Sequence, residues 1–371
     1  MTITSDIYKS DIVSIILPTY NEKDNISILL DKIDSYLKET KYEVIIVDDD
    51  SKDGTIESIN KLLGTYPITL IVRKGVKGLA SAVVEGFKHS NGGIFVVMDA
   101  DLQHPPEKII SLIEEINKGA DIVIASRYNE EKGFGEFNIF RKIISKGANS
   151  LARVLFQKLS NIKDIQSGFF AIRKEVIEGV SLNPIGYKIL LEILIIGNYK
   201  NIKEIGFKFS KRENGDSKLG IKTIIDYINH LINLSLRTGD LKRFIKYCII
   251  GISGIFINTL VLFFFTSMLG LFYLLLSSAI AYEVSILTNF ILNDHWTFKD
   301  LVIDGKSHNF ITRAIYYNYA MIAGAILGIF LLYVFTSIFS INYLISNLIS
   351  ILVVFLWRYY ASITMVWKHK I

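Results

Sequence analysis

The stretch 94–106 reads IFVVMDADLQHPP, and it decides the fold. Its first five residues are apolar and rich in branched side chains, which is typical of a buried β-strand. Asp99 and Asp101 follow directly and alternate with Ala100, so both carboxylates turn toward one side. The proline pair at the end then stops the strand. The stretch therefore predicts a strand that ends in two converging carboxylates.

Four further apolar runs of similar length lie in the first half of the chain, with helical patterns between them. The runs cover 13–17, 44–47, 69–72 and 122–125, and helical patterns cover 25–37 and 78–89. Strands that alternate with helices predict a parallel, doubly wound α/β sheet. Ligands bind beyond the carboxyl ends of the strands in such sheets, so the residues after each run are candidates for a site.

Polar residues follow the first two runs as well. The segment 18–22 reads PTYNE, and the segment 48–55 reads DDDSKDGT. Residues 48–50 can be turn chemistry before the helix that follows Thr55, with Asp53 and Gly54 as the turn itself. Glu22 suits either the first turn of a helix or a ligand. Three adjacent carboxylates repel one another, so we expect at least one of residues 48–50 to hydrogen-bond a base or a ribose. Three strand ends thus converge on one acidic rim.

The acidic rim predicts a divalent-cation site. Asp99, Asp101 and Gln103 lie in the same phase and offer oxygen atoms, which are the ligands that Mg²⁺ and Mn²⁺ prefer. A diphosphate would complete the coordination shell. An isolated Asp-X-Asp is more often an Asx turn or a helix cap, but the position directly after a buried strand favours the metal.

The second half of the chain has a different composition. Its apolar runs are each long enough to cross about 30 Å of hydrocarbon as a helix. They cover 247–267, 273–292, 314–339 and 344–366. The links 268–272 and 340–343 contain no Lys or Arg, whereas basic residues flank the opposite ends. We therefore expect a multi-pass protein of the cell membrane, with both termini and the first half in the cytoplasm. Residues 1–10 are polar, so we expect no signal peptide.

Composition argues against several other classes. The single cysteine, Cys248, excludes an internal disulfide and a Cys-based metal cluster. The net charge of +5 comes without a dense basic block, so we expect no nucleic acid partner and assign the basic excess to lipid and phosphate. Glu283 lies inside the second predicted span, where it indicates either a hydrogen bond to Asn258 or another polar residue of the helix bundle, or a path for lipid phosphate.

We divide the chain into three parts. These are a catalytic domain (1–220), an interfacial helix with its linker (221–243) and a membrane domain of four spans (244–371). The segments 139–159 and 221–236 are amphipathic, and the first is also basic. Such helices are suited to the lipid headgroup region, although a packed helix with a solvated face is the alternative.

The order of the motifs resembles that of the family 2 glycosyltransferases, specifically the dolichyl-phosphate mannose synthases. The resemblance runs from about 12 to 219 and rests on four segments: 18–22, 47–55, 98–106 and 126–128. In the second half, 288–298 reads TNFILNDHWTF and is similar to the signature of GtrA-like four-helix membrane domains. The resemblance implies a GT-A (Rossmann-like) fold and an all-α transmembrane domain. It also implies inverting, metal-dependent transfer of mannose from GDP-mannose to dolichyl or polyprenyl phosphate.

The resemblance further implies roles for individual residues. Nucleoside contacts would come from Pro18, Tyr20, Glu22, Val47 and Asp49. The metal on the diphosphate would be bound by Asp99, Asp101 and Gln103, with Ala100 beside the nucleotide-sugar. The lipid phosphate would be bound by Arg127, Arg141 and Ser145, and the donor phosphates by Lys188, Arg212 and Lys218. Asp101, Arg127 and Lys188 are the expected catalytic residues.

Two departures from the family pattern and several alternatives remain. Gly78-Leu79-Ala80 stands where Gly-Leu-Gly is commoner, and 129–137 lacks the usual glycine pair. A UDP-sugar as donor is the alternative within the same chemistry, because the motifs do not fix the base. Translocation of a lipid-linked sugar by the membrane domain is an alternative of another class. A processive polysaccharide synthase is disfavoured, because the first half lacks a Gln-X-X-Arg-Trp element.

Overall fold

The computed structural model describes residues 12–75, 77–129, 139–208, 221–270, 273–303 and 307–367, without the side chains of 139–146 and 221–222. The chain forms two compact units. The catalytic unit lies within Met1–Asn149 and Asn161–Leu234, and the membrane unit within Ser150–Ser160 and Ser235–Ile371. The predicted domain limits at 220 and 243 stay a prediction.

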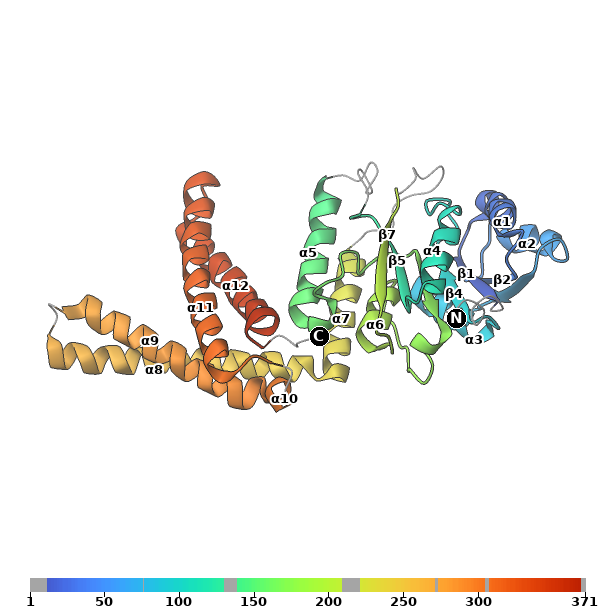
Figure 1. Ribbon diagram of the computed structural model, residues 1–371. Helices are drawn as coiled ribbons and strands as arrows, with labels where there is room; N and C mark the ends of the chain where they lie inside the picture. Colours follow the sequence, from blue (N-terminus) through green and yellow to red (C-terminus); the bar gives the residue numbers. More distant parts are fainter. Residues whose placement is uncertain are drawn as a thin grey trace. The chain divides into compact units, whose positions relative to one another are not determined.

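The catalytic unit is built on one seven-stranded sheet with the strand order β3-β2-β1-β4-β6-β5-β7 (Figure 1). Its strands are β1 (Val13–Thr19), β2 (Tyr42–Asp48), β3 (Ile68–Val72), β4 (Ile94–Val97), β5 (Ile122–Ser126), β6 (Phe170–Arg173) and β7 (Ile202–Gly206). Its helices are α1 (Lys23–Leu37), α2 (Thr55–Leu62), α3 (Leu79–His89), α4 (Lys108–Asn117) and α6 (Ile189–Ile196), together with the first parts of α5 (Ile139–Leu155) and α7 (Ile221–Thr238). All five predicted strands are confirmed.

The five predicted strands run parallel to one another, as predicted, and one strand that was not predicted runs against them. β6 pairs antiparallel with both β4 and β5. An antiparallel neighbour needs no crossover back to the starting edge, so the chain enters β6 from the edge at which β5 ends. This places residues 164–169, just before β6, at the same edge as the acidic strand ends.

Apolar faces of the helices hold the sheet from both sides. Ile26, Leu29, Leu30 and Ile33 of α1 recur at helical spacing, are fully buried and share a core with α4 and alternate residues of β1. Each such side chain contributes about 1.5–3 kcal/mol by its burial. α3 packs on the opposite face, where a Cβ on Gly86 would come within 2.5 Å of the Ile16 side chain. The result is a three-layer α/β/α unit.

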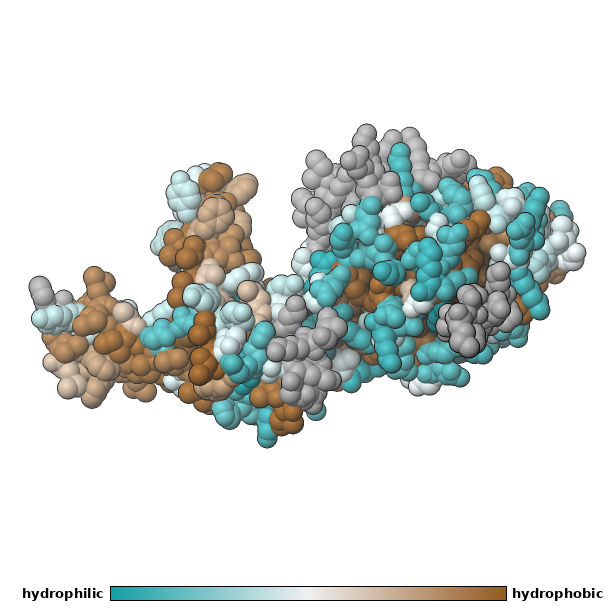
Figure 2. Space-filling view, viewed as in Figure 1, coloured by the Kyte–Doolittle hydropathy of each residue, from teal (hydrophilic) through white to brown (hydrophobic). Residues whose placement is uncertain are grey.

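The membrane unit contains the four predicted spans, which confirms that half of the fold. The spans are Asp240–Leu269 (α8), Leu274–Thr297 (α9 and the π-helical turn η4), Phe310–Ile338 (α11 and η5) and Tyr343–Val366 (α12 and η6). Hydrophobic residues cover their outer surfaces, as Figure 2 shows, and Phe263 is 72% exposed. Large apolar side chains on the outside of a helix pair are suited to lipid rather than water. The chain is therefore a membrane protein.

A buried ion pair ties the ends of three of these helices together. Arg313 of α11 donates two hydrogen bonds to Asp294 of η4, at 2.7 and 2.9 Å. The indole N–H of Trp367 donates to the same carboxylate at 2.8 Å, and the ring stacks on Phe298 at 4.2 Å. Asp294 and Phe298 belong to the segment 288–298 with the GtrA-like signature, so packing explains these two residues of it.

Glu283 makes the structural hydrogen bond that was predicted within the helix bundle. Its carboxylate accepts from Asn318 of α11 at 2.6 Å, which is one of the other polar residues of the bundle rather than Asn258. The sequence predicted the kind of contact but does not say which spans are neighbours.

Candidate active site

Loops after β1 and β2 are fastened to each other at the edge of the sheet. The backbone N–H of Asn21 donates to the Ser51 hydroxyl at 2.8 Å, and the Lys52 N–H donates to the Asn21 side chain at 3.2 Å. Asn21 and Asp50 both have φ of 59°, in the left-handed region that only short polar residues and glycine adopt readily. The two loops therefore form one preorganised ledge.

The three adjacent aspartates after β2 do different work. Asp48 is fully buried and accepts from the backbone and hydroxyl of Ser51, at 2.8 and 2.7 Å. This is turn chemistry, as the alternative interpretation held. Asp50 is partly exposed and pairs with Lys52 at 2.8 Å. Neighbouring carboxylates thus avoid repulsion because each has its own partner.

Asp49 pairs with a basic group that follows another strand. It forms a buried ion pair with Arg73, which follows β3, and it accepts from the Gly78 N–H at 2.8 Å. Arg73 also donates to the Gly78 carbonyl and the Ser81 hydroxyl, each at 3.0 Å. Arg73 therefore joins the Asp49 loop to the start of α3. Sequence reasoning missed it, although a lone arginine directly after a predicted strand was a visible signal.

The other predicted nucleoside residues line the same ledge. Pro18 and Val47 are buried near the ends of β1 and β2. The Tyr20 hydroxyl accepts from Lys77 at 2.9 Å. Glu22 stands before α1 and its carboxylate accepts from Asn25 at 2.8 Å, which fits its interpretation as a helix-start acid. Their roles toward a ligand stay predictions.

Beyond β4 lie the predicted metal ligands. The Asp101 side chain is 7% exposed and accepts from the Gln103 N–H at 3.2 Å, while Asp99 is more open, with a side chain 30% exposed. Ala100 is buried between them. Across the described part of the chain, no three His, Cys, Asp or Glu side chains gather into a metal cage. Two carboxylates and an amide suit a hard cation that takes its remaining ligands from phosphate oxygens, as Mg²⁺ does.

His104 is buried and holds the backbone of Asp99 in place through a hydrogen bond. Its Nδ1 accepts the Asp99 N–H at 2.9 Å, and its ring stacks on Phe169 at 5.2 Å. Burial lowers the pKa of His104, so the ring is neutral and carries its proton on Nε2. Gly168 leaves the necessary room, because a Cβ there would lie 3.2 Å from the ring and 3.3 Å from the Asp99 carboxylate. The sequence suggested no role for His104 beyond ending the strand.

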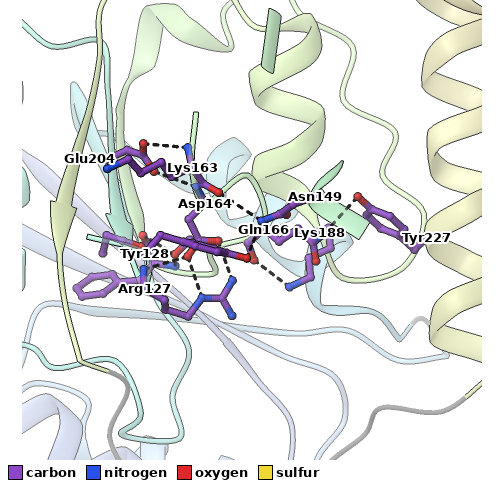
Figure 3. A network of polar contacts seen from close by, with 12 residues as sticks. Arg127, Tyr128, Asn149, Lys163, Asp164, Gln166, Lys188, Glu204 and Tyr227 are labelled. Carbon is purple, nitrogen blue, oxygen red and sulfur yellow. Dashed lines mark hydrogen bonds and ion pairs between the residues drawn. The ribbon is translucent and has the colours of Figure 1, made fainter. Parts of the chain in front are cut away.

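Arg127, after β5, is held by a partner that the sequence did not indicate. Its Nε and Nη2 donate to the two carboxylate oxygens of Asp164 at 2.8 and 2.7 Å, and its backbone N–H donates to the same group (Figure 3). Burial would raise the pKa of Asp164, but the guanidinium outweighs it and holds that pKa below its usual range. Glu204 accepts from the backbone of Lys163 and Asp164, at 3.0 and 2.9 Å. The arginine is thus oriented before any ligand binds.

Lys188, at the start of α6, is the second cation of the site. Its ammonium donates to the Gln166 carbonyl at 2.9 Å and lies 4.3 Å from the centre of the Tyr187 ring. Burial lowers the pKa of Lys188 to about 7, and the Arg127 charge adds to the effect. A lysine poised in this way gains charge when an anion arrives.

Two helices contact this cluster through side-chain hydrogen bonds, which Figure 3 shows. The Tyr227 hydroxyl of α7 donates to the Ala148 carbonyl of α5 at 2.9 Å and accepts from the Gln166 amide at 3.3 Å. Asn149 of α5 donates to the Tyr128 hydroxyl at 3.0 Å. Gln166 therefore lies between Tyr227 and Lys188.

The acidic and basic groups share one cavity. A cavity of about 120 Å³ is lined by Asp99, His104, Arg127, Gln166 and Lys188 among others. A larger hollow of about 430 Å³ lies near Glu115 and Lys200, at the edge where β5 and β7 begin, and contains none of these groups. The smaller cavity is the candidate active site, because it brings a carboxylate and two cations together beside the strand ends.

Four predicted residues are not placed by the structure. Arg212 and Lys218 lie outside the described residues, and Arg141 and Ser145 lie on the part of α5 whose side chains are not described. Their roles stay predictions.

Two family models match the chain. Residues 14–180 match "Glycosyl transferase family 2", and residues 246–367 match "GtrA/DPMS, transmembrane domain". A Pyrococcus furiosus protein called dolichol-phosphate mannosyltransferase is 45% identical over 96% of this chain and 99% of its own length. Proteins of the same name from Mycosarcoma maydis and Saccharomyces cerevisiae are each 36% identical over 60% of this chain, covering 78% and 86% of their own lengths. The Pyrococcus furiosus protein thus matches both the catalytic unit and the membrane unit of this chain.

Proposed function

We propose, from the premise that this chain belongs to the dolichol-phosphate mannosyltransferase family of membrane glycosyltransferases, that it transfers mannose from GDP-mannose to dolichyl or another polyprenyl phosphate. The observation that carries the proposal is the cavity in which Asp99 lies with Arg127 and Lys188. The same chain contains four helices long enough to span a membrane, which fits an acceptor that resides in the membrane.

The acidic side of the cavity suits a metal-bound diphosphate. Asp99, Asp101 and Gln103 would hold Mg²⁺ or Mn²⁺, which would neutralise charge on the departing nucleoside diphosphate. The ledge after β1 and β2, with Asp49 as a hydrogen-bond acceptor, would bind the nucleoside. Donors on the base or ribose would compete with Arg73 and Gly78 for the Asp49 carboxylate.

The basic side suits the acceptor and the donor phosphates. A phosphate monoester has its second pKa near 6, so it is mostly a dianion at neutral pH and needs no general base. Arg127, held in place by Asp164, would bind that dianion through its guanidinium, together with Arg141 and Ser145. Lys188, with Arg212 and Lys218, would stabilise charge on the leaving diphosphate. In-line attack at the anomeric carbon would invert its configuration.

Charge flanking the spans supports an orientation for the chain. The links 268–272 and 340–343 lack Lys and Arg, so they belong outside, with the catalytic unit and both termini in the cytoplasm of a cell. The donor nucleotide-sugar would then reach the cavity from the cytosol.

A panel of radiolabelled donors tests this function. Membranes with the full chain, Mg²⁺ and a polyprenyl phosphate should label lipid from GDP-mannose, and thin-layer analysis should show one mannosyl phospholipid. Asp101→Ala should abolish labelling, whereas Asp24→Ala, which removes an exposed carboxylate of α1, should leave it unchanged. Labelling from UDP-glucose alone would replace the donor, and no labelling from any nucleotide-sugar would overturn the proposal.

A further inference from the structure

The fourth span carries an arginine well inside the apolar part of the membrane unit. Arg358 of α12 donates from Nη2 to the backbone carbonyl of Met321 of α11 at 3.0 Å. A Cβ on Gly324 would come within 2.5 Å of its Nε. The span Phe310–Ile338 has 29 residues, and Gly324 is the fifteenth of them, its central residue. The guanidinium therefore lies beside the middle of α11.

The direction of the side chain rules out simple snorkelling to the nearer end of the span. Helical side chains lean toward the N-terminus of their own helix. α12 begins at Tyr343 and, continued by η6, ends just before Trp367. The side chain of Arg358 therefore leans toward the Tyr343 end, away from Trp367 and toward the interior of the span. Snorkelling would carry the charge toward a membrane surface, and here the contacts with Met321 and Gly324 hold it near mid-span.

Arg358 has no carboxylate partner among the residues that the structure describes. Its guanidinium donates to two neutral oxygens, the Met321 carbonyl and the Tyr282 hydroxyl of α9, the latter at 3.4 Å. Its Nε is buried and makes no hydrogen bond. The acidic residue next to Tyr282 is Glu283, whose carboxylate is turned to Asn318.

The same unit shows how an arginine is neutralised when its role is structural. Arg313 is paired through two hydrogen bonds with Asp294, and Trp367 adds a third donor to that carboxylate. Arg358 differs, because its hydrogen-bond partners are neutral oxygens. A guanidinium does not lose its proton in proteins, so it keeps its full charge. A charge inside a bilayer without a counter-ion is costly, which makes an intramembrane arginine a functional site by default.

The chemistry of the missing counter-ion follows from the setting. Arginine binds phosphate through paired N–H donors, and the anions that reside in a bilayer are lipid phosphates. The two hairpins of the unit, α8 with α9 and α11 with α12, meet near α10 and diverge from there in Figure 1. Arg358 and Tyr282 come from different hairpins, so a headgroup beside them would contact both.

We propose that Arg358 and Tyr282 form an intramembrane binding site for the phosphate of a lipid, separate from the catalytic cavity. Arg358 supplies the terminal N–H groups of its guanidinium, and Tyr282 supplies a hydroxyl donor. Polyprenyl phosphate is the occupant that the proposed function would supply, and only that identity rests on the proposed function.

Equilibrium binding to the full chain in phosphatidylcholine nanodiscs tests the site. Radiolabelled polyprenyl phosphate should bind the wild-type chain in two classes, one catalytic and one at Arg358. In Arg358→Gln the second class should weaken by about tenfold or more, as expected when a charged hydrogen-bonding partner is lost. Arg358→Lys should keep part of it. Lys242→Gln, which removes an exposed positive charge at the start of α8, is the matched control and should keep both classes.

Further measurements separate the outcomes. Transfer to a short, water-soluble prenyl phosphate should be unchanged in Arg358→Gln, which shows an intact catalytic unit independently of the second site. Gly324→Ala crowds the guanidinium without removing charge and should also weaken the second class. Displacement by excess phosphatidylglycerol would assign the site to phospholipid phosphates, and resistance to it would assign the site to polyprenyl phosphate. Unchanged binding in both Arg358→Gln and Gly324→Ala, or an equal loss in Lys242→Gln, would overturn the proposal.

Discussion

The catalytic unit and the membrane unit each bury an arginine against an aspartate in nearly the same geometry. Arg127 reaches both oxygens of Asp164 at 2.8 and 2.7 Å, and Arg313 reaches both oxygens of Asp294 at 2.7 and 2.9 Å. In each pair the carboxylate takes a further N–H, from the Arg127 backbone or from Trp367. The chemistry of the pair alone therefore does not reveal its role.

The surroundings distinguish the two pairs. Arg127 lines a cavity with Asp99 and Lys188, and that cavity can admit a ligand. The Arg313 pair lies beneath the stacked rings of Phe298 and Trp367, and both rings are fully buried. We infer that one pair positions a catalytic cation and the other fastens helix ends, and the following experiments test that difference.

Asp164→Asn should have the largest effect, because it harms both activity and stability. Removing one charge of a buried pair leaves the other uncompensated, at a cost of about 3–5 kcal/mol. The amide of asparagine has one acceptor oxygen where the carboxylate has two, so Arg127 loses one of its two side-chain hydrogen bonds and with it its orientation. We expect transfer to fall by about a hundredfold or more per folded molecule. Initial rates and chemical unfolding measure the two effects. An unchanged rate would show that Arg127 does not bind the acceptor.

Asp294→Asn should affect stability alone. We expect the unfolding free energy of the membrane unit to fall by about 3 kcal/mol for the same electrostatic reason. Transfer to a water-soluble prenyl phosphate, per folded molecule, should stay within about twofold of the wild type. Thermal unfolding in detergent and initial rates measure these quantities. A selective loss of transfer would show that this pair is more than a fastening.

Lys188 should take up a proton when the donor diphosphate binds. Burial lowers the pKa of Lys188 to about 7, so the free enzyme holds it mostly neutral at pH 8.5, and a nearby diphosphate favours the charged form. Calorimetry with GDP and Mg²⁺ in buffers of different ionisation enthalpy should show close to one proton taken up at pH 8.5 and little at pH 6. Lys188→Arg, which is charged throughout, should abolish the uptake. Equal uptake in both proteins would assign the proton to another group.

Tyr227→Phe should have the smallest effect of the series. It removes the hydroxyl that joins the Ala148 carbonyl to the Gln166 amide, and Gln166 in turn holds Lys188. One lost hydrogen bond contributes about 1 kcal/mol, or about fivefold in kcat. Tyr199→Phe is the matched control, since that hydroxyl also donates to a helix carbonyl, away from the cavity. A similar loss of kcat in both variants would indicate general loosening.

Local patterns in the sequence were enough to predict most of the fold. The runs that form β1 to β5 are apolar and branched, and the four spans are long and uninterrupted, so burial dictates both. β6 and β7 were missed, because four or five residues such as those of Phe170–Arg173 carry too little pattern. The direction of β6 depends on where the chain re-enters the sheet, which no local pattern records.

The candidate site was predictable where it follows a strand and unpredictable where it depends on a distant partner. Asp99 and Asp101 were visible because they end β4. The pairing of Arg127 with Asp164 spans 37 residues, and that of Asp49 with Arg73 spans 24. His104 was hidden for another reason, because its role comes from burial beneath Asp99, and burial belongs to the folded chain.

Helix α5 belongs to both units, since residues up to Asn149 group with the sheet and Ser150–Ser160 group with the spans. Beyond that division Val154 packs on the aromatic cluster of the spans, and Gln157 donates to the Ile363 carbonyl at 3.1 Å. A gene fragment that stopped before α8 would therefore encode a protein in which the end of α5 has lost these contacts and exposes its apolar surface. The two units therefore cannot be separated by a single cut in the chain. A water-soluble version requires that the end of α5 be redesigned as well.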